Sequence, residues 1–195
     1  IRWTGDRHTI FLEGNNYARE IEFLEGVEGE NLALSIHFYE PVEFTFNWQP
    51  DTKYPGLIAG TKWDKWEIKK RLQQYADFSR RKGWPVYVGE FGIASRCSYC
   101  GEEFNWVKDI LSVFEQFGFH WTYWTYKSVK GMDVPDGLFQ LSDIKGLVGI
   151  KSICSGMENL PNILGKREQE YFSLLRTENF QVNPFLKKVL AEILA

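Results

Sequence analysis

The chain has 195 residues, which is enough for one large hydrophobic core and too few for two. Aromatic residues make up 16% of it, with eight Trp, and such rings either pack in cores or line sites for flat apolar ligands and sugar faces. The net charge of −3 and the absence of a long Lys/Arg block argue against a nucleic-acid partner, and no apolar run reaches the length of a membrane span.

Apolar strand-like segments alternate with amphipathic helical segments along the chain. Strands are predicted at 8–14, 31–41, 84–92 and 119–127, and helical segments at 17–24, 64–83, 102–118, 167–178 and 183–195. In the segment 64–83 the side chains predicted to face inward are Trp66, Leu72, Tyr75, Ala76 and Phe78. Long loops are expected at 42–62 and 128–165, and the first of these is aromatic and typical of a functional loop.

The alternation predicts a parallel sheet with right-handed helical crossovers, which is an α/β fold. Polar and aromatic side chains stand at the carboxyl end of each expected strand: Glu13, His37, Tyr39, Glu90 and Trp124. Such side chains collect on that rim in a (β/α) TIM barrel, whereas a doubly wound sheet has its ligand crevice at one switch point. We therefore expect a half-barrel of about four β/α units over residues 1–195.

Glu90 is the most unusual of these residues, because a carboxylate follows a buried-looking strand between Gly89 and Gly92. A charge at such a place is costly unless it is paired or has a chemical role. The alternative to a catalytic role is a structural salt bridge with a Lys or Arg. His37 has an alternative too, since a histidine within an apolar strand is often part of the core.

Four segments in order, IFLEGNNYA, SIHFYEP, PVYVGEFG and HWTYWTYK, resemble strands five to eight of glycoside hydrolase family 5, the cellulase and mannanase family. The resemblance covers about residues 8–140 and implies a retaining mechanism with Glu90 as the nucleophile. It also implies that His37 and Tyr39 flank the reacting sugar, that Tyr39 holds Glu90 by a hydrogen bond, and that Trp124 forms the platform beneath that sugar.

Several physical arguments agree with these roles. A phenol O–H stabilises an ionised carboxylate, a Trp face matches the axial C–H bonds of a pyranose, and glycines beside Glu90 allow close approach of the substrate. Trp121 and Trp124 are three positions apart, so on a strand they face opposite sides. Glu13 does not occupy the acid/base position of the family, and we interpret it as a wall or loop-anchoring residue. The remaining loop aromatics line outer sugar subsites or pack under the loop: Trp48, Tyr54 and Trp63.

The acid/base carboxyl of the family follows an Asn on the fourth strand, and no Asn-Glu-Pro motif occurs in this chain. The chain begins at Ile1 without a Met or a signal peptide, so we expect a piece of a longer protein. It needs a complementary N-terminal half-barrel, as a segment or a separate chain, or association with itself. Exposed apolar edges of a lone half-sheet support this expectation.

The resulting functional hypothesis is a retaining endo-β-1,4-glucanase that acts outside the cell, where polysaccharides are met. Glucan, mannan and xylan are not separated by the sequence. The alternative is a non-catalytic, carbohydrate-binding half-barrel. No cofactor or metal is expected, because Cys97, Cys100, Cys154 and scattered His do not make up the about four ligands of a zinc site. A local disulfide or free thiols are the expectation for these Cys residues.

Overall fold

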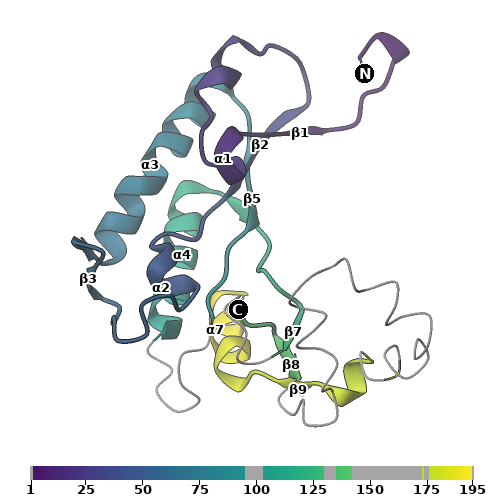
Figure 1. Ribbon diagram of the computed structural model, residues 1–195. Coiled ribbons are helices and arrows are strands. Elements are labelled where there is room, and N and C mark those ends of the chain that lie inside the picture. The colour runs from purple at the N-terminus through teal and green to yellow at the C-terminus, as the bar shows by residue number, and fades with distance from the viewer. Residues whose placement is uncertain (1, 95–102, 130–134, 142–172, 174–175, 195) are drawn as a thin grey trace, which may run out of the picture.

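The computed structural model describes residues 2–94, 103–129, 135–141, 173 and 176–194. Its centre is a four-stranded sheet made of β1 (Ile10–Glu13), β2 (Leu32–His37), β5 (Val86–Glu90) and β6 (His120–Trp121) (Figure 1). All three strand pairs are parallel, and the spatial order is the order in the chain. The three Cys residues, and most of the predicted helix at 167–178, lie outside the described residues.

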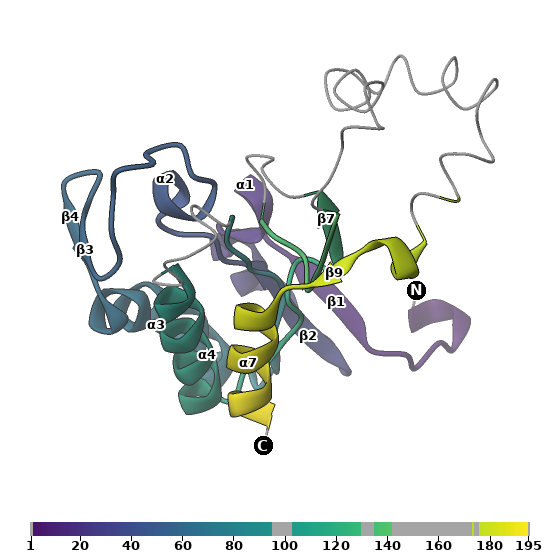
Figure 2. The ribbon, with the colours of Figure 1, turned by 90° about the horizontal axis from the view of Figure 1, so that it is seen from below.

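Two long helices connect the later strands, as the sequence predicts. Helix α3 (Lys65–Lys82) begins after Asp64, whose carboxylate accepts hydrogen bonds from two backbone N–H groups of the first turn, and it ends at Gly83 with a φ of 68°. Helix α4 (Glu103–Phe117) packs against α3, and α7 (Pro184–Leu194) packs against α4. Figure 2 shows these three helices side by side along one face of the sheet. No helix in the described ranges has the length and apolar character needed to cross a bilayer.

The sheet face beneath the helices holds the hydrophobic core. Leu34 and Ile36 of β2 and Val86 and Val88 of β5 are buried there, at alternate positions of each strand. Aromatic rings of the connecting helices fill the layer above them. The strands therefore owe their burial on this side to α3 and α4.

The opposite sheet face carries side chains that the described residues leave uncovered. Phe11 of β1 is 54% exposed and meets the ring of Tyr87 edge-on at 5.2 Å. The Tyr87 hydroxyl lies 2.9 Å from Oγ1 of Thr122, which is also exposed. Parallel sheets are normally covered on both faces, and the described residues do not fully cover these three side chains.

Trp66 corrects one prediction for α3, because its side chain is 68% exposed, with the Lys70 ammonium 5.5 Å from its ring centre. The buried stripe of the helix includes Ile68, Leu72 and Tyr75 instead. At 3.6 residues per turn, Trp66 lies about 120° around the helix from Leu72, and this rotation carries it away from the sheet.

The fourth strand is shorter than the predicted 119–127, because β6 ends at Trp121. In place of the helical segment predicted at 17–24, the structure has the single turn α1 (Asn15–Ala18) and a 3-10 turn at Glu22–Gly26. The expected loops contain α2 (Val42–Thr45), β3 (Gly56–Ile58), most of β4 (Thr61–Trp63), most of β7 (Lys127–Val129) and β8 (Phe139–Leu141). The other short elements are β9 (Gln181–Val182) and 3-10 turns at Arg2–Thr4 and Thr177–Asn179. Strands β3 and β4 form an antiparallel hairpin, whereas β7, β8 and β9 form a small separate sheet.

Candidate active site

Glu90 is the last residue of β5 and lies at the carboxyl edge of the central sheet. An irregularity in the β2–β5 register between Ile36 and His37 pairs His37 with Glu90. The backbone N–H of Phe38 then donates to the Glu90 carbonyl oxygen at 2.9 Å, so the two strands stay joined past their ends. The same pairing brings two side chains to Glu90: His37, the last residue of β2, and Tyr39, two residues further along the chain.

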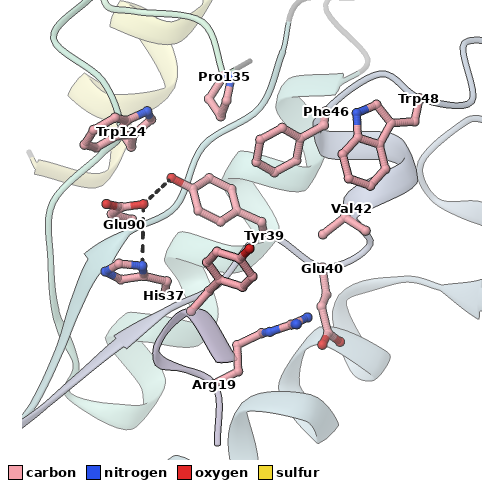
Figure 3. A pocket seen from close by; sticks show the side chains of 11 residues that line it. Arg19, His37, Tyr39, Glu40, Val42, Phe46, Trp48, Glu90, Trp124 and Pro135 are labelled. Carbon is pink, nitrogen blue, oxygen red and sulfur yellow. Dashed lines mark hydrogen bonds and ion pairs between the residues drawn. The ribbon is translucent and has the colours of Figure 1, made fainter. Parts of the chain in front are cut away.

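One carboxylate oxygen of Glu90 has two polar neighbours (Figure 3). The Tyr39 hydroxyl donates to Oε2 at 3.0 Å, and Nδ1 of His37 lies 3.5 Å from the same oxygen. Burial, together with the nearby charge of Glu90 and this hydrogen bond, raises the pKa of the Tyr39 phenol far above its usual range. The raised pKa keeps the proton on the Tyr39 phenol, so Tyr39 is the donor in this hydrogen bond.

Tyr39 is itself held from two sides. The Thr45 hydroxyl donates to the Tyr39 carbonyl oxygen at 2.6 Å, and the Tyr39 ring packs against Phe46 with ring centres 5.1 Å apart. Both partners come from α2 and the residue that follows it. The donor to Glu90 is therefore placed by the start of the long aromatic loop.

The structural alternatives for Glu90 and His37 find no support in the described residues. Within those ranges no Lys or Arg lies within ion-pair distance of Glu90, whose side chain is partly exposed. His37 is also partly exposed and lines a cavity, with a carboxylate near each ring nitrogen. Neither side chain is a buried structural partner.

Trp124 follows β6 by three residues, and its indole is 45% exposed at the same cavity. Its backbone N–H donates to the Phe91 carbonyl oxygen at 2.8 Å. Gly92 makes this approach possible, since a Cβ atom at that position would stand 2.1 Å from the Trp124 carbonyl oxygen. Trp121 faces the other way, as predicted, and packs edge-on against Phe91.

The cavity has a volume of about 540 Å³ and is open to solvent on one side (Figure 3). Its walls are Tyr17, Arg19, His37, Tyr39, Glu40, Val42, Phe46, Trp48, Glu90, Trp124 and Pro135. Trp48 is 62% exposed, and its ring continues the row that Tyr39 and Phe46 begin. Tyr54 and Trp63 are buried, so the structure assigns them to packing and leaves Trp48 as the outer-subsite candidate.

Sequence reasoning placed the four predicted site residues together but missed several walls of the cavity. Phe46 and Val42 lie in the expected loop at 42–62, and the aromatic content of that loop was the sequence feature that could have indicated them. Arg19, Glu40 and Pro135 gave no signal of their own, because each is an ordinary loop residue until the fold brings it to the rim. The described residues contain no group of three or more His, Cys, Asp and Glu side chains arranged to hold a metal ion.

Glu13 ends β1 on the same edge of the sheet. The Ser35 hydroxyl donates to its Oε1 at 2.9 Å, and Nε2 of His37 lies 3.6 Å from that oxygen. It therefore faces the histidine of the site as well as solvent, which the prediction of a wall or loop-anchoring residue did not include.

Comparison with known proteins places this geometry in context. The sequence profile of the cellulase family, described as Cellulase (glycosyl hydrolase family 5), matches residues 1–130. Endoglucanase C of Acetivibrio thermocellus is 24% identical over 160 residues, which cover 66% of this chain and 46% of that protein. Cellodextrinase A of Ruminococcus flavefaciens is 30% identical over 112 residues, or 53% of this chain and 32% of that protein.

Among solved structures, an endoglucanase from Thermotoga maritima superposes with a TM-score of 0.54 at 23% identity, covering 71% of this chain and 45% of that one. This likeness, with the parallel sheet and its helices, confirms the predicted (β/α) TIM-barrel class, of which the chain forms a part. The chain spans less than half the length of the relatives that it matches.

Proposed function

Because the chain belongs to glycosyl hydrolase family 5, we propose that it supplies the nucleophile half of a retaining endo-β-1,4-glucanase, with Glu90 as the nucleophile. The observation that carries this proposal is the placement of the Glu90 carboxylate. It stands at the carboxyl edge of the sheet, accepts a hydrogen bond from Tyr39, and faces an open cavity with Trp124 on its rim. This is the rim that carries the chemistry in TIM barrels.

The reaction is a double displacement. An oxygen of Glu90 attacks the anomeric carbon of the sugar while the bond to the leaving-group oxygen breaks, and a second carboxyl protonates that oxygen. The product of this step is a glycosyl ester of Glu90. Water, deprotonated by the second carboxylate, then attacks the same carbon and releases Glu90, so the configuration is retained.

The three neighbours of Glu90 have separate roles in this scheme. Tyr39 fixes the direction of the carboxylate through the 3.0 Å hydrogen bond. His37 stands beside the same oxygen and reaches the hydroxyl groups of the reacting sugar from the cavity wall. The exposed Trp124 indole offers the apolar face on which that sugar stacks.

The second carboxyl comes from an N-terminal half-barrel that completes the ring. In retaining enzymes it stands about 5–5.5 Å from the nucleophile. The uncovered sheet face, with Phe11, Tyr87 and Thr122, supports this arrangement, because it provides the surface that the remaining strands of a barrel would cover. The chain together with that half is called the complete enzyme below. Two copies of this chain closing one ring are the competing assembly.

The substrate of the complete enzyme is a β-1,4-glucan, which it meets outside the cell because a polymer does not cross the membrane. The open side of the cavity and the exposed Trp48 beyond Phe46 support internal cleavage, since a chain can lie across the site in both directions. The relatives named endoglucanase support a glucan as the substrate.

The test compares Glu90→Gln with the unaltered residue in the complete enzyme. The amide keeps the shape of the side chain and removes its nucleophilic charge, so hydrolysis of soluble glucan falls by several orders of magnitude while glucan binding and the thermal unfolding midpoint are kept. The first product released by the unaltered enzyme has the β configuration by NMR. Near-normal hydrolysis by Glu90→Gln, or an α product, overturns the nucleophile assignment. Glucan binding by the complete enzyme without any turnover supports a non-catalytic binding module instead.

A further inference from the structure

Glu13 lies at the end of β1, the edge strand of the sheet, and its carboxylate is held by a hydrogen bond. It is directly opposite Ser35 in the parallel register of β1 and β2, and the buried Ser35 hydroxyl donates to its Oε1 at 2.9 Å. The Glu13 side chain is 55% exposed. Ser35 therefore fixes the direction of a carboxylate for which the proposed reaction has no direct use.

His37 lies between this carboxylate and the proposed nucleophile. Its Nε2 is 3.6 Å from Oε1 of Glu13, and its Nδ1 is 3.5 Å from Oε2 of Glu90. A neutral imidazole donates from only one of its two nitrogens, and the other nitrogen then presents a lone pair to an anion. The orientation of the ring therefore decides which nitrogen meets which carboxylate.

We propose that Glu13 is a positioning residue, which holds the His37 ring with Nδ1 turned toward Glu90. Ser35 fixes the Glu13 carboxylate, and that carboxylate meets the Nε2 edge of the ring. The proposal rests on the proposed function and adds a residue to it.

The direction of the ring matters because Nδ1 contacts the same Glu90 oxygen that accepts from Tyr39. When Glu13 is absent, the His37 ring can turn about its side-chain bonds, and that oxygen loses one of its two polar neighbours. Glu13 therefore acts on the chemical step rather than on substrate binding.

The experiment uses Glu13→Gln and Glu13→Ala in the complete enzyme. Since the carboxylate is half exposed, the expected loss in kcat is about two- to five-fold in both variants, with KM unchanged. In a His37→Asn background the loss disappears, since Glu13 acts through that ring. Glu22→Gln, an exposed carboxyl on a separate 3-10 turn, is the matched control and keeps the full kcat.

The ¹⁵N shifts of the His37 ring give a second readout that needs no turnover. Glu13→Gln should move the Nε2 signal more than the Nδ1 signal, whether or not the protein hydrolyses glucan. Loss of activity in every form would then count against the proposed function, while the shifts still decide the role of Glu13. Unchanged shifts, full kcat in Glu13→Gln, or an equal loss in the His37→Asn background would overturn the positioning role.

Discussion

Gly92 is the backbone position on which the Trp124 platform depends, and Gly92→Ala is the perturbation that tests it. A Cβ atom at this position would stand 2.1 Å from the Trp124 carbonyl oxygen and 2.9 Å from Cβ of Pro135. Neither neighbour is the far end of a flexible side chain, so the added methyl group forces a shift of backbone. Trp124 and Pro135 both line the cavity, which means that the shift occurs within the proposed sugar site.

The size of the shift follows from ordinary contact distances. A carbon and an oxygen atom rarely approach within about 3.0 Å, so the Trp124 carbonyl has to retreat by about 0.9 Å. A misplacement of about 1 Å at a site of reaction costs on the order of 100-fold in rate. Overpacking adds about 1–3 kcal/mol of lost stability, because the methyl group has no room. We expect both effects from this single methyl group.

The assay measures kcat/KM on soluble glucan and the thermal unfolding midpoint of the complete enzyme. Gly92→Ala should lose about 100-fold in kcat/KM, and most of that loss should vanish in a Trp124→Ala background, where the platform is already absent. Gly89→Ala is the matched control for stability, since its Cβ would meet no atom closer than 3.5 Å. A Gly92→Ala enzyme with normal kcat/KM would refute the claim that this glycine places Trp124.

Three further predictions concern other parts of the site and the core. Tyr39→Phe removes a hydrogen bond to the Glu90 carboxylate, and a hydrogen bond to a charged group contributes about 1.5–3 kcal/mol. Steady-state kinetics should therefore show kcat/KM reduced by about 10- to 150-fold, and an unchanged value would contradict the role of the hydroxyl. Burial raises the pKa of Tyr75 to about 12 in the folded protein, whereas an unfolded chain has a Tyr pKa of about 10. The free energy of unfolding that this difference contributes is complete below about pH 10. It falls by about 1.4 kcal/mol per pH unit from there to about pH 12. Urea unfolding across this range measures the decline, and Tyr75→Phe should make it shallower; equal slopes would count against the burial of this phenol. Trp48→Ala should weaken binding of long oligosaccharides by about 1–2 kcal/mol with little effect on short ones, as isothermal titration with a length series would show, whereas equal weakening at every length would argue against an outer subsite.

The sequence was informative where a side chain contradicts its surroundings. Glu90 after an apolar strand, and His37 within one, were recognisable because charge and polarity are unexpected there. Glu90 and His37 lie close together because the parallel pairing of β2 and β5 brings the carboxyl ends of the two strands to one edge of the sheet. The strand pattern placed Tyr39 and Trp124 at strand ends, and the resemblance supplied their roles.

Other features depend on contacts that no local pattern encodes. Trp66 is apolar and close in sequence to the buried stripe of α3, but it lies about 120° around the helix from Leu72 and is exposed to solvent. Its apolar character and approximate spacing therefore misplaced it. The contact of Glu13 with His37 requires the register of β1 on β2. The glycines beside Glu90 were expected to admit substrate, whereas Gly92 admits the backbone of Trp124. Such distances between chain segments appear only once the sheet is assembled.

The central claim is that the Glu90 carboxylate forms a bond to the anomeric carbon of the sugar, and covalent trapping tests it most directly. A fluorinated cellobioside with an activated leaving group forms the glycosyl ester quickly and hydrolyses slowly, so the complete enzyme can be digested and its peptides weighed. We predict one added cellobiosyl group on the peptide that contains Glu90, and none in Glu90→Gln. A label on any other residue, or turnover without a label, would contradict the account.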